Sequence, residues 1–366
     1  LYTWIAKSES TTLTGKVGFR TITLEMNEGT WNVPYVPSTR AFPPMTVTLN
    51  GRAIFAKGSN WVNPEIFPGV ITRDTYLPLI KLAQDGNMNI FRVWGGGIIN
   101  KDCFFELCDE MGIMVWNEFP LACNDYRGSD KYLKILEQEA VSILKRLRKY
   151  TCIAFWCGGN ELFNSWSGMT DQSLALRLLN KLCYEYDIKR PFLPTSTIMG
   201  VGHGTYTFCY GDEDVYQIYS KGGFTAYTEF GVPGTPDVSY LKEFIPEDEL
   251  FPVEDGKTWE LHHANHAWKE DTWLCKGIMA KYFPKPQNID ELVYQSQWLQ
   301  CEGYKAIFEE ARRQKPFASM ALNWCYNEPW KTAANNSIIS YPNIPKPSYY
   351  AVKESLRGTL FSGKMK

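Results

Sequence analysis

The chain has 366 residues, of which 44% are hydrophobic and 15% are aromatic, and its formal net charge at pH 7 is -2. This length is enough for one large domain of about 250 to 300 residues with a smaller segment beside it. The near-neutral charge excludes an electrostatic case for binding nucleic acid or an anionic membrane. No apolar stretch approaches the roughly 18 to 20 residues that cross a bilayer.

Residues 1 to about 45 alternate apolar and polar side chains, most clearly over 16–24, and this is the period of a half-buried strand. One or two strands are not stable alone. We therefore expect 1–45 to be the C-terminal remnant of a β-sandwich domain with a proline-marked linker at Pro34, Pro37, Pro43 and Pro44. The chain opens at Leu1 without the basic and apolar regions of a signal peptide, so we expect a fragment of a longer polypeptide.

From residue 46 onward, short apolar runs alternate with helix-length amphipathic stretches, which is typical of βα repetition. The expected strands are 54–57, 90–94, 113–116, 153–157, 192–195, a poorly defined sixth at 206–210, 224–229 and 319–324. The expected helices are 73–84, 102–111, 132–149, 171–187 and 289–313. The interval 251–286 has no clean period and is expected to be a long insertion over the mouth of the barrel. Eight strands predict a (β/α)8 TIM barrel over 46–366.

Two glutamates follow strand-type runs, Glu161 after 153–157 and Glu229 at the end of 224–229. In a (β/α)8 barrel, such positions lie at the C-terminal face, where catalytic groups are displayed. Two carboxyl groups there are the requirement for hydrolysing a glycosidic bond. The aromatic content suits sugar binding, because flat apolar sugar faces stack on rings, although large cores also use aromatics. The alternative for each glutamate is an ordinary surface or buried structural carboxylate.

Five ordered blocks of the chain resemble the signature blocks of glycoside hydrolase family 2, and in particular its β-mannosidase branch. The blocks are 92–98 (RVWGGGI), 108–119 (CDEMGIMVWNEF), 159–161 (GNE), 228–231 (TEFG) and 321–330 (ALNWCYNEPW). Residues 50–61 are similar to the first barrel strand of that family. Residues 18–21 are similar to the last strand of the immunoglobulin-like domain that precedes its barrel. The resemblance thus covers nearly the whole chain.

The resemblance implies roles for eight side chains. Glu161 matches the acid/base and Glu229 the nucleophile of a retaining enzyme. The substrate-binding positions that it implies are Arg92, which would pair with the nucleophile, Trp94 and Trp324 against the sugar, Glu118 and Asn160 at sugar hydroxyls, and His203 on the barrel rim. For the two tryptophans the alternative is core packing, and for His203 it is a structural histidine.

The function implied is a retaining, exo-acting β-glycosidase that favours β-mannosides and works by double displacement through a glycosyl-enzyme intermediate. The chain has Gly159, Glu118 and Glu328 where typical β-mannosidases have Asn, Asp and Asp, so β-galactosides and related β-linked sugars stay open. Two non-enzymatic functions also stay open, a catalytically silent carbohydrate-binding relative and a scaffold domain of a larger assembly.

Partners and cofactors follow from the same residues. A glycoside or oligosaccharide is the expected partner, and the N-terminal domains of the family are expected to complete the site. No motif predicts a nucleotide or organic cofactor, and ten scattered cysteines without a CxxC pair predict no metal site. We expect Glu229 to raise the pKa of Glu161 by its charge. The sequence leaves the location open, and only analogy with the family points to a secreted or periplasmic one.

Overall fold

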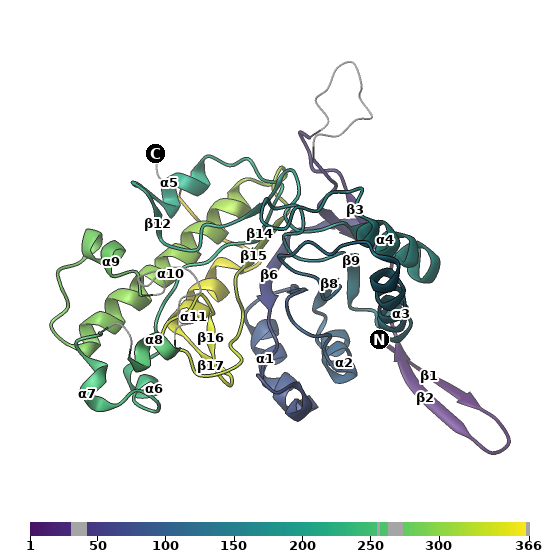
Figure 1. The fold of residues 1–366 in the computed structure, drawn as a ribbon, viewed down its shortest axis with the longest axis horizontal. Helices are drawn as coiled ribbons and strands as arrows, with labels where there is room; N and C mark the ends of the chain where they lie inside the picture. The colour runs from purple at the N-terminus through teal and green to yellow at the C-terminus, as the bar shows by residue number, and fades with distance from the viewer. Residues whose placement is uncertain (31–41, 255–256, 263–273, 364–366) are drawn as a thin grey trace.

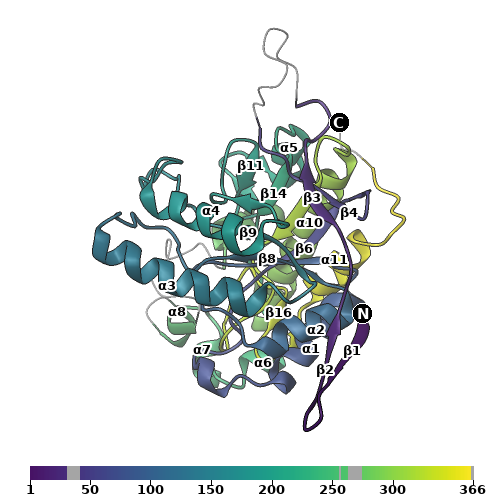
Figure 2. The same cartoon turned by 90° about the vertical axis from the view of Figure 1, so that its right-hand side faces the viewer.

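The centre of the protein is a curled sheet of eight parallel strands, seen in the computed structural model of residues 1–30, 42–254, 257–262 and 274–363 (Figures 1 and 2). In chain order the strands are β6 (Ala56–Trp61), β7 (Ile90–Val93), β8 (Met114–Glu118), β9 (Ile153–Cys157), β10 (Phe192–Leu193), β11 (Val201–His203), β14 (Ala226–Glu229) and β15 (Met320–Asn323). Their spatial order is β10-β9-β8-β7-β6-β15-β14-β11. This is a TIM-like barrel in which the first strand pairs with the last, and β10 and β11 form the two edges of the curled sheet.

Helices surround this sheet and alternate with its strands over most of the chain. The long ones are α1 (Arg73–Asp85), α2 (Asp102–Met111), α3 (Asp130–Leu147), α4 (Leu174–Asp187), α10 (Ile289–Arg313) and α11 (Pro347–Ser355). In α3 the Ser129 side chain caps the first turn by accepting from the Tyr132 amide. The buried residues of α3 recur at helical spacing, so one face of the helix packs on the sheet. The five long helices expected from the sequence are all present.

Shorter elements lie in the connections. Between β6 and α1 lies η1 (Pro68–Val70). Between β11 and β14 lie β12 (Cys209–Tyr210), β13 (Glu213–Asp214) and α5 (Val215–Ser220). Later in the chain they are α6 (Val238–Leu241), α7 (Glu247–Leu250), α8 (Thr258–His262), α9 (Lys276–Tyr282), β16 (Ile339–Ser340) and β17 (Ile344–Pro345). None of the described helices is both long and apolar enough to cross a membrane.

A small antiparallel sheet closes the end of the barrel at which the strands begin. It consists of β3 (Ile22–Glu25), β4 (Thr46–Leu49) and β5 (Arg52–Ile54). Ile22 and Val47 are buried in one cluster with Ala56, Ile90 and Met320, each the first residue of a barrel strand. Residues before 46 therefore help to form the barrel core. The open end of the barrel is the opposite one.

The first two strands, β1 (Tyr2–Lys7) and β2 (Thr12–Val17), form a separate hairpin that projects from the body (Figure 1). All six residues of β1 are exposed. The expectation that 1–45 is the remnant of a β-sandwich domain stays a prediction. Pro34 and Pro37 of the expected linker lie outside the described residues.

Two expected strands are displaced. The first barrel strand is Ala56–Trp61 and not 54–57, because it continues through Gly58, Ser59 and Asn60, whose polarity broke the apolar pattern. The sixth is Val201–His203 and not 206–210, where the aromatic run forms a loop and β12. The interval 251–286, expected to be a long insertion over the mouth of the barrel, contains α8 and α9, while its residues 255–256 and 263–273 are outside the described part.

Candidate active site

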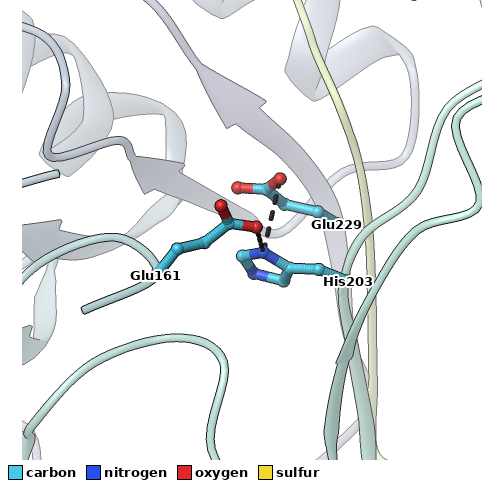
Figure 3. Close-up of side chains that lie close together, drawn as sticks. All are labelled: Glu161, His203 and Glu229. Atoms are coloured by element: carbon cyan, nitrogen blue, oxygen red, sulfur yellow. Dashed lines mark hydrogen bonds and ion pairs between the residues drawn. The ribbon is translucent and has the colours of Figure 1, made fainter. Parts of the chain in front are cut away.

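Three titratable side chains meet at the open end of the barrel, as Figure 3 shows. Glu229 and His203 are the last residues of β14 and β11, and Glu161 follows the end of β9. Parallel strands of a barrel end at the same face, so residues far apart in the chain converge there. The structure therefore brings the two glutamates together as the strand-end argument expects, and it adds a histidine between them.

The imidazole of His203 lies against both carboxylates. Its Nδ1 atom is 2.8 Å from Oε1 of Glu161 and 3.5 Å from Oε2 of Glu229. Its Nε2 atom is 2.9 Å from the Ser196 hydroxyl, which is 2.8 Å from the Thr228 hydroxyl. One carboxylate oxygen of Glu161, one of Glu229 and one ring nitrogen of His203 all lie within 4.8 Å of one another. The two carboxyl groups are thus close enough for a single imidazole to contact both.

Glu229 is held in place from two further sides. The Nη1 atom of Arg92 donates to its Oε1 at 2.5 Å, and the Tyr206 hydroxyl donates to its Oε2 at 2.6 Å. The side chain of Glu229 is only 6% exposed. Burial, followed by the charge of Glu229, raises the pKa of Tyr206 well above its ordinary value, so this hydroxyl stays a donor. Together these contacts fix the orientation of the Glu229 carboxyl group.

Arg92 is the centre of a buried polar network. Its guanidinium also contacts Asn60, Glu118 and Asn160, at 2.7, 2.8 and 2.6 Å. Burial by itself disfavours the charged form, but Glu118 and Glu229 outweigh it and raise the pKa of Arg92. The arginine is therefore a permanent cation beside Glu229, in the position that the sequence resemblance predicted.

Two of the predicted sugar-binding residues, Glu118 and Asn160, already make hydrogen bonds within this network. Both oxygens of Glu118 are taken, one by Arg92 and the other by the Gly95 amide at 2.7 Å, and its side chain is 0% exposed. Asn160 accepts from Arg92 and donates to the Cys123 sulfur at 3.2 Å. In this arrangement both residues orient Arg92, and their contact with a sugar stays a prediction.

Glu161 occupies an unusual backbone position. Its φ angle is 52°, which places it in the left-handed region, where non-glycine residues are uncommon. Its Oε2 atom lies 3.5 Å from the Cys123 sulfur. Burial raises its pKa, but the hydrogen bond and charge of His203 outweigh burial, and the net pKa is lowered. From the charge of Glu229 we expected this pKa to be raised, but the net shift is downward because His203 contacts the Glu161 carboxylate and is its largest lowering influence.

Trp94 and Trp324, which directly follow β7 and β15, form an aromatic pair. Their ring centroids are 5.0 Å apart at an interplanar angle of 74°. Both are half-buried, in contrast to the fully buried Trp61, Trp116 and Trp156. The pair therefore keeps ring surface available, which core packing alone does not require. Stacking on a sugar is consistent with that exposure and stays a prediction.

Sequence reasoning missed three contributors to this site, namely Asn60, Tyr206 and the Ser196–Thr228 hydroxyl pair. Asn60 lies on β6 one residue before Trp61 and donates to the Thr228 carbonyl at 2.8 Å. A buried polar residue near the end of a predicted barrel strand was the signal for it. Tyr206 was hidden in the run that we expected to be a strand.

No cation is assigned to the group formed by Glu161, His203 and Glu229. Within the described residues it is the set of His, Cys, Asp and Glu side chains close enough to share one. The imidazole already bridges the carboxylates, and Arg92 and Tyr206 satisfy Glu229. A cavity of about 590 Å³ adjoins the site at His203 and Tyr206 and is walled by further aromatic side chains, namely Tyr210, Tyr219, Phe224 and Tyr227.

The chain is similar in sequence to characterised β-mannosidases, while no protein-family model matches it. It is 28% identical over 334 residues to the β-mannosidase of Capra hircus, covering 79% of this chain and 37% of the relative. It is 26% identical over 346 residues to β-mannosidase B of Thermothelomyces thermophilus, covering 84% of this chain and 40% of the relative. The chain thus spans well under half the length of these relatives.

Solved structures agree with these relatives. The β-D-mannosidase from Dictyoglomus thermophilum superposes with a TM-score of 0.83 at 29% identity, covering 95% of this chain and 43% of that one. An exo-chitosanase from Amycolatopsis orientalis gives a TM-score of 0.77 at 16% identity, over 94% of this chain and 41% of that one. The latter likeness supports the fold alone.

In sequence and fold the chain is similar to part of known glycoside hydrolases. Within that class the chain is β-mannosidase-like, since both its sequence relatives and a similar solved structure are β-mannosidases.

Proposed function

We propose that this barrel hydrolyses terminal β-linked glycosides with retention of anomeric configuration, as an exo-acting enzyme of the glycoside hydrolase family 2 type. The observation that carries the proposal is the separation of Glu161 and Glu229, whose nearest oxygens lie within 4.8 Å. Retaining enzymes hold their two carboxyl groups about 5 to 5.5 Å apart, whereas inverting enzymes need about 6.5 to 9.5 Å to admit a water. The spacing favours direct attack on the sugar.

In this proposal Glu229 is the nucleophile. Its carboxylate attacks the anomeric carbon, and the bond from that carbon to the leaving oxygen breaks as Glu161 gives this oxygen a proton. Arg92 and Tyr206 hold the attacking group in one orientation through their hydrogen bonds. Water then attacks the glycosyl-enzyme ester, Glu161 takes the proton of the water, and Glu229 is released. Protons and bonds balance over the two steps without any further reactant.

Glu161 must be protonated for the first step, although His203 lowers its pKa in the free protein. A sugar bound between the carboxylates would displace the imidazole from Glu161. Burial, the largest influence, would then raise the pKa of Glu161 against only the smaller lowering influences of Cys123 and Arg92. We therefore infer that substrate binding itself shifts Glu161 toward its acid form. Binding energy would be used to prepare the catalyst only when a substrate is present.

β-Mannosides are the favoured substrates because the characterised relatives carry that name. Trp94 and Trp324 would pack against the sugar, and Asn160 and Glu118 would contact its hydroxyls after a small rearrangement around Arg92. β-Galactosides and related β-linked sugars are the second choice, since Gly159, Glu118 and Glu328 depart from the typical pattern.

The segment 1–45 is proposed to be the end of an immunoglobulin-like domain, with the catalytic domain over 46–366. The exposed hairpin β1–β2 supports this, because a two-stranded sheet needs a partner to be stable. In the family, an N-terminal domain closes one side of the pocket. We expect turnover by the present chain to rise when the upstream domains are supplied, and an unchanged rate would contradict this.

The experiment is release of the aryl alcohol from aryl β-mannoside, β-galactoside, β-glucoside, β-glucuronide and β-glucosaminide. Glu229→Ala serves as the control, and proton NMR identifies the anomer formed first. Turnover of one sugar with a β-product, lost in the control, is the expected result. An α-product would refute the nucleophile assignment. Binding of a sugar without turnover, unchanged by Glu229→Ala and Glu161→Ala, would favour the silent carbohydrate-binding relative.

A further inference from the structure

The loop after β9 carries an exposed tryptophan five residues beyond Glu161. The side chain of Trp166 is 64% exposed, whereas tryptophan is on average among the more buried residue types. Trp61, Trp116, Trp156 and Trp259 are fully buried in the same protein. An indole displayed to solvent on the loop that carries Glu161 can bind a ligand in a way that a core indole cannot, because its flat apolar face is free to stack.

The exposure of Trp166 does not come from a loose loop. The Ser167 hydroxyl donates to the carbonyl oxygen of Glu161 at 2.7 Å, and the Met169 amide donates to the carbonyl oxygen of Leu162 at 3.1 Å. Leu162, Ser167 and Met169 are all buried. The indole is therefore held out by a frame that is anchored on both sides. A preformed platform of this kind loses little conformational freedom when a ligand stacks on it.

The position of the loop fits the leaving-group side of the site. Ser167 touches the backbone of Glu161, and Trp166 is its neighbour, with consecutive Cα atoms about 3.8 Å apart. In the proposed reaction Glu161 protonates the leaving oxygen, so the aglycone must lie on the Glu161 side. Glu229, the nucleophile, approaches from the other face of the sugar ring.

A second loop extends this surface. The Thr197 hydroxyl donates to Oδ1 of Asn164 at 2.8 Å, which ties the loop between β10 and β11 to the loop of Trp166. Two residues after Thr197, the side chain of Met199 is 71% exposed. Methionine is an adaptable apolar side chain that packs against irregular ligand surfaces. Two exposed apolar side chains thus lie on loops that a hydrogen bond joins, and one of these loops carries Glu161.

We propose that Trp166 is the stacking platform for the first leaving-group sugar, so that the substrates are β-linked oligosaccharides or glycans and not simple small-aglycone glycosides. The inference rests on the proposed function, since it assigns the leaving-group side from the role of Glu161. Met199 contributes the adjoining apolar edge.

The test compares two substrates that share mannose, the sugar favoured in the proposed function. One is the β-linked disaccharide of that sugar, and the other is its glycosyl fluoride, whose leaving group is too small to reach Trp166. For Trp166→Ala we expect roughly tenfold lower kcat/KM on the disaccharide, as for the loss of one aromatic stacking contact. The fluoride should be turned over at the wild-type rate within about twofold.

Two further variants separate stacking from damage to the fold. Trp166→Phe keeps a stacking ring and should retain most of the disaccharide activity. Trp4→Ala removes another indole, which is 43% exposed on the projecting hairpin, and should leave kcat/KM unchanged on both substrates. An equal loss on disaccharide and fluoride would mean that Trp166 supports Glu161 structurally. An unchanged rate on the disaccharide would overturn the platform.

A binding measurement keeps the inference separate from the proposed reaction. In the Glu229→Ala background, disaccharide affinity should fall roughly tenfold when Trp166→Ala is added. If the wild-type protein turns over neither substrate but this loss of affinity is found, the proposed hydrolysis fails and the sugar platform stands. If turnover is found and the affinity does not depend on Trp166, the platform fails and the hydrolysis stands.

Discussion

Arg92 and Glu229 form a buried ion pair, with Nη1 of the arginine 2.5 Å from Oε1 of the glutamate and side-chain exposures of 0% and 6%. The same guanidinium binds Glu118, Asn60 and Asn160. One cation thus fixes the proposed nucleophile to three strands of the barrel, β6, β7 and β8, and to the residue before Glu161. Its planar, five-donor geometry is what makes these simultaneous contacts possible.

Arg92→Lys should therefore abolish most of the activity although the charge is kept. A lysine ammonium cannot span Glu229, Glu118 and the two amides at once, so the carboxylate loses its fixed orientation. We expect kcat to fall by roughly a hundredfold or more, as when one preorganised donor is lost from an active site. Steady-state kinetics on the best aryl glycoside measures this.

Arg73→Lys is the matched control for that change. Arg73 pairs with Glu110 at 2.6 Å on the surface, where its side chain is 43% exposed. Exposed pairs contribute about 0 to 1 kcal/mol, so both stability and kcat should stay close to wild type. A near-wild-type kcat for Arg92→Lys, in a protein with an unchanged circular dichroism spectrum, would contradict the role given to Arg92.

The pH dependence of the reaction should depend on His203. Burial raises the pKa of Glu161, but the hydrogen bond and charge of His203 lower it, and Cys123 and Arg92 add to the lowering. In His203→Gln the largest lowering influence is gone while burial remains, so the pKa of Glu161 rises. Glu161 must be protonated to act as an acid. The alkaline limb of the kcat/KM profile should therefore move to higher pH.

His262→Gln is the control for the titrating side chain. His262 lies on α8, where its Nδ1 atom is 2.7 Å from the carbonyl oxygen of Lys331 and its ring stacks on Trp330 at 4.9 Å. Its replacement should leave both limbs of the profile in place. If the alkaline limb of His203→Gln stays where it is or moves to lower pH, His203 does not set the proton affinity of Glu161.

The two glutamates could be found from the sequence because each follows a short apolar or aromatic run, and the ends of parallel strands converge. Strand β9 and the helices α2 and α10 lie where the pattern placed them. The contacts among the side chains were not predictable in the same way. His203 reaches Glu161 across 42 residues of sequence, and nothing local to either residue indicates that approach.

The displaced strands have a common cause. Ser59 and Asn60 are buried although they are polar, because their side chains bind the carbonyl oxygens of Asn323 on the adjacent strand β15 and of Thr228 on β14. An apolar pattern stops where such residues begin, so it places the strand too early. Around 206–210 the opposite occurred, since aromatic side chains that wall a cavity resemble those of a strand. The errors thus lie next to the site.

Gly58→Ala should destabilise the barrel at the strand that carries Asn60. A Cβ atom built at Gly58 would lie 1.8 Å from the carbonyl oxygen of Ile90 on the paired strand β7, so the backbone of one strand must move. Overpacking of this kind costs about 1 to 3 kcal/mol of unfolding free energy. Gly69→Ala is the control, because nothing lies within 4 Å of its built Cβ. Denaturant unfolding compares them, and equal stabilities would refute the close approach.

A second buried ion pair should matter for stability away from the reacting groups. Lys346 and Glu328 lie 3.0 Å apart with side chains 1% and 0% exposed, and the ammonium also donates to the Gly234 carbonyl and the Ser337 hydroxyl. Lys346→Met leaves a buried carboxylate without its counter-charge, which costs about 3 to 5 kcal/mol.

Two further proteins test whether this loss comes from the unpaired charge. Adding Glu328→Gln to Lys346→Met removes the stranded charge, so unfolding in denaturant should show part of the stability recovered. Lys331→Met breaks the exposed pair with Glu243, 2.8 Å apart at side-chain exposures of 35% and 50%, and should cost less than about 1 kcal/mol. A double variant as unstable as Lys346→Met alone would mean that lost packing, and not the unpaired Glu328, accounts for the effect.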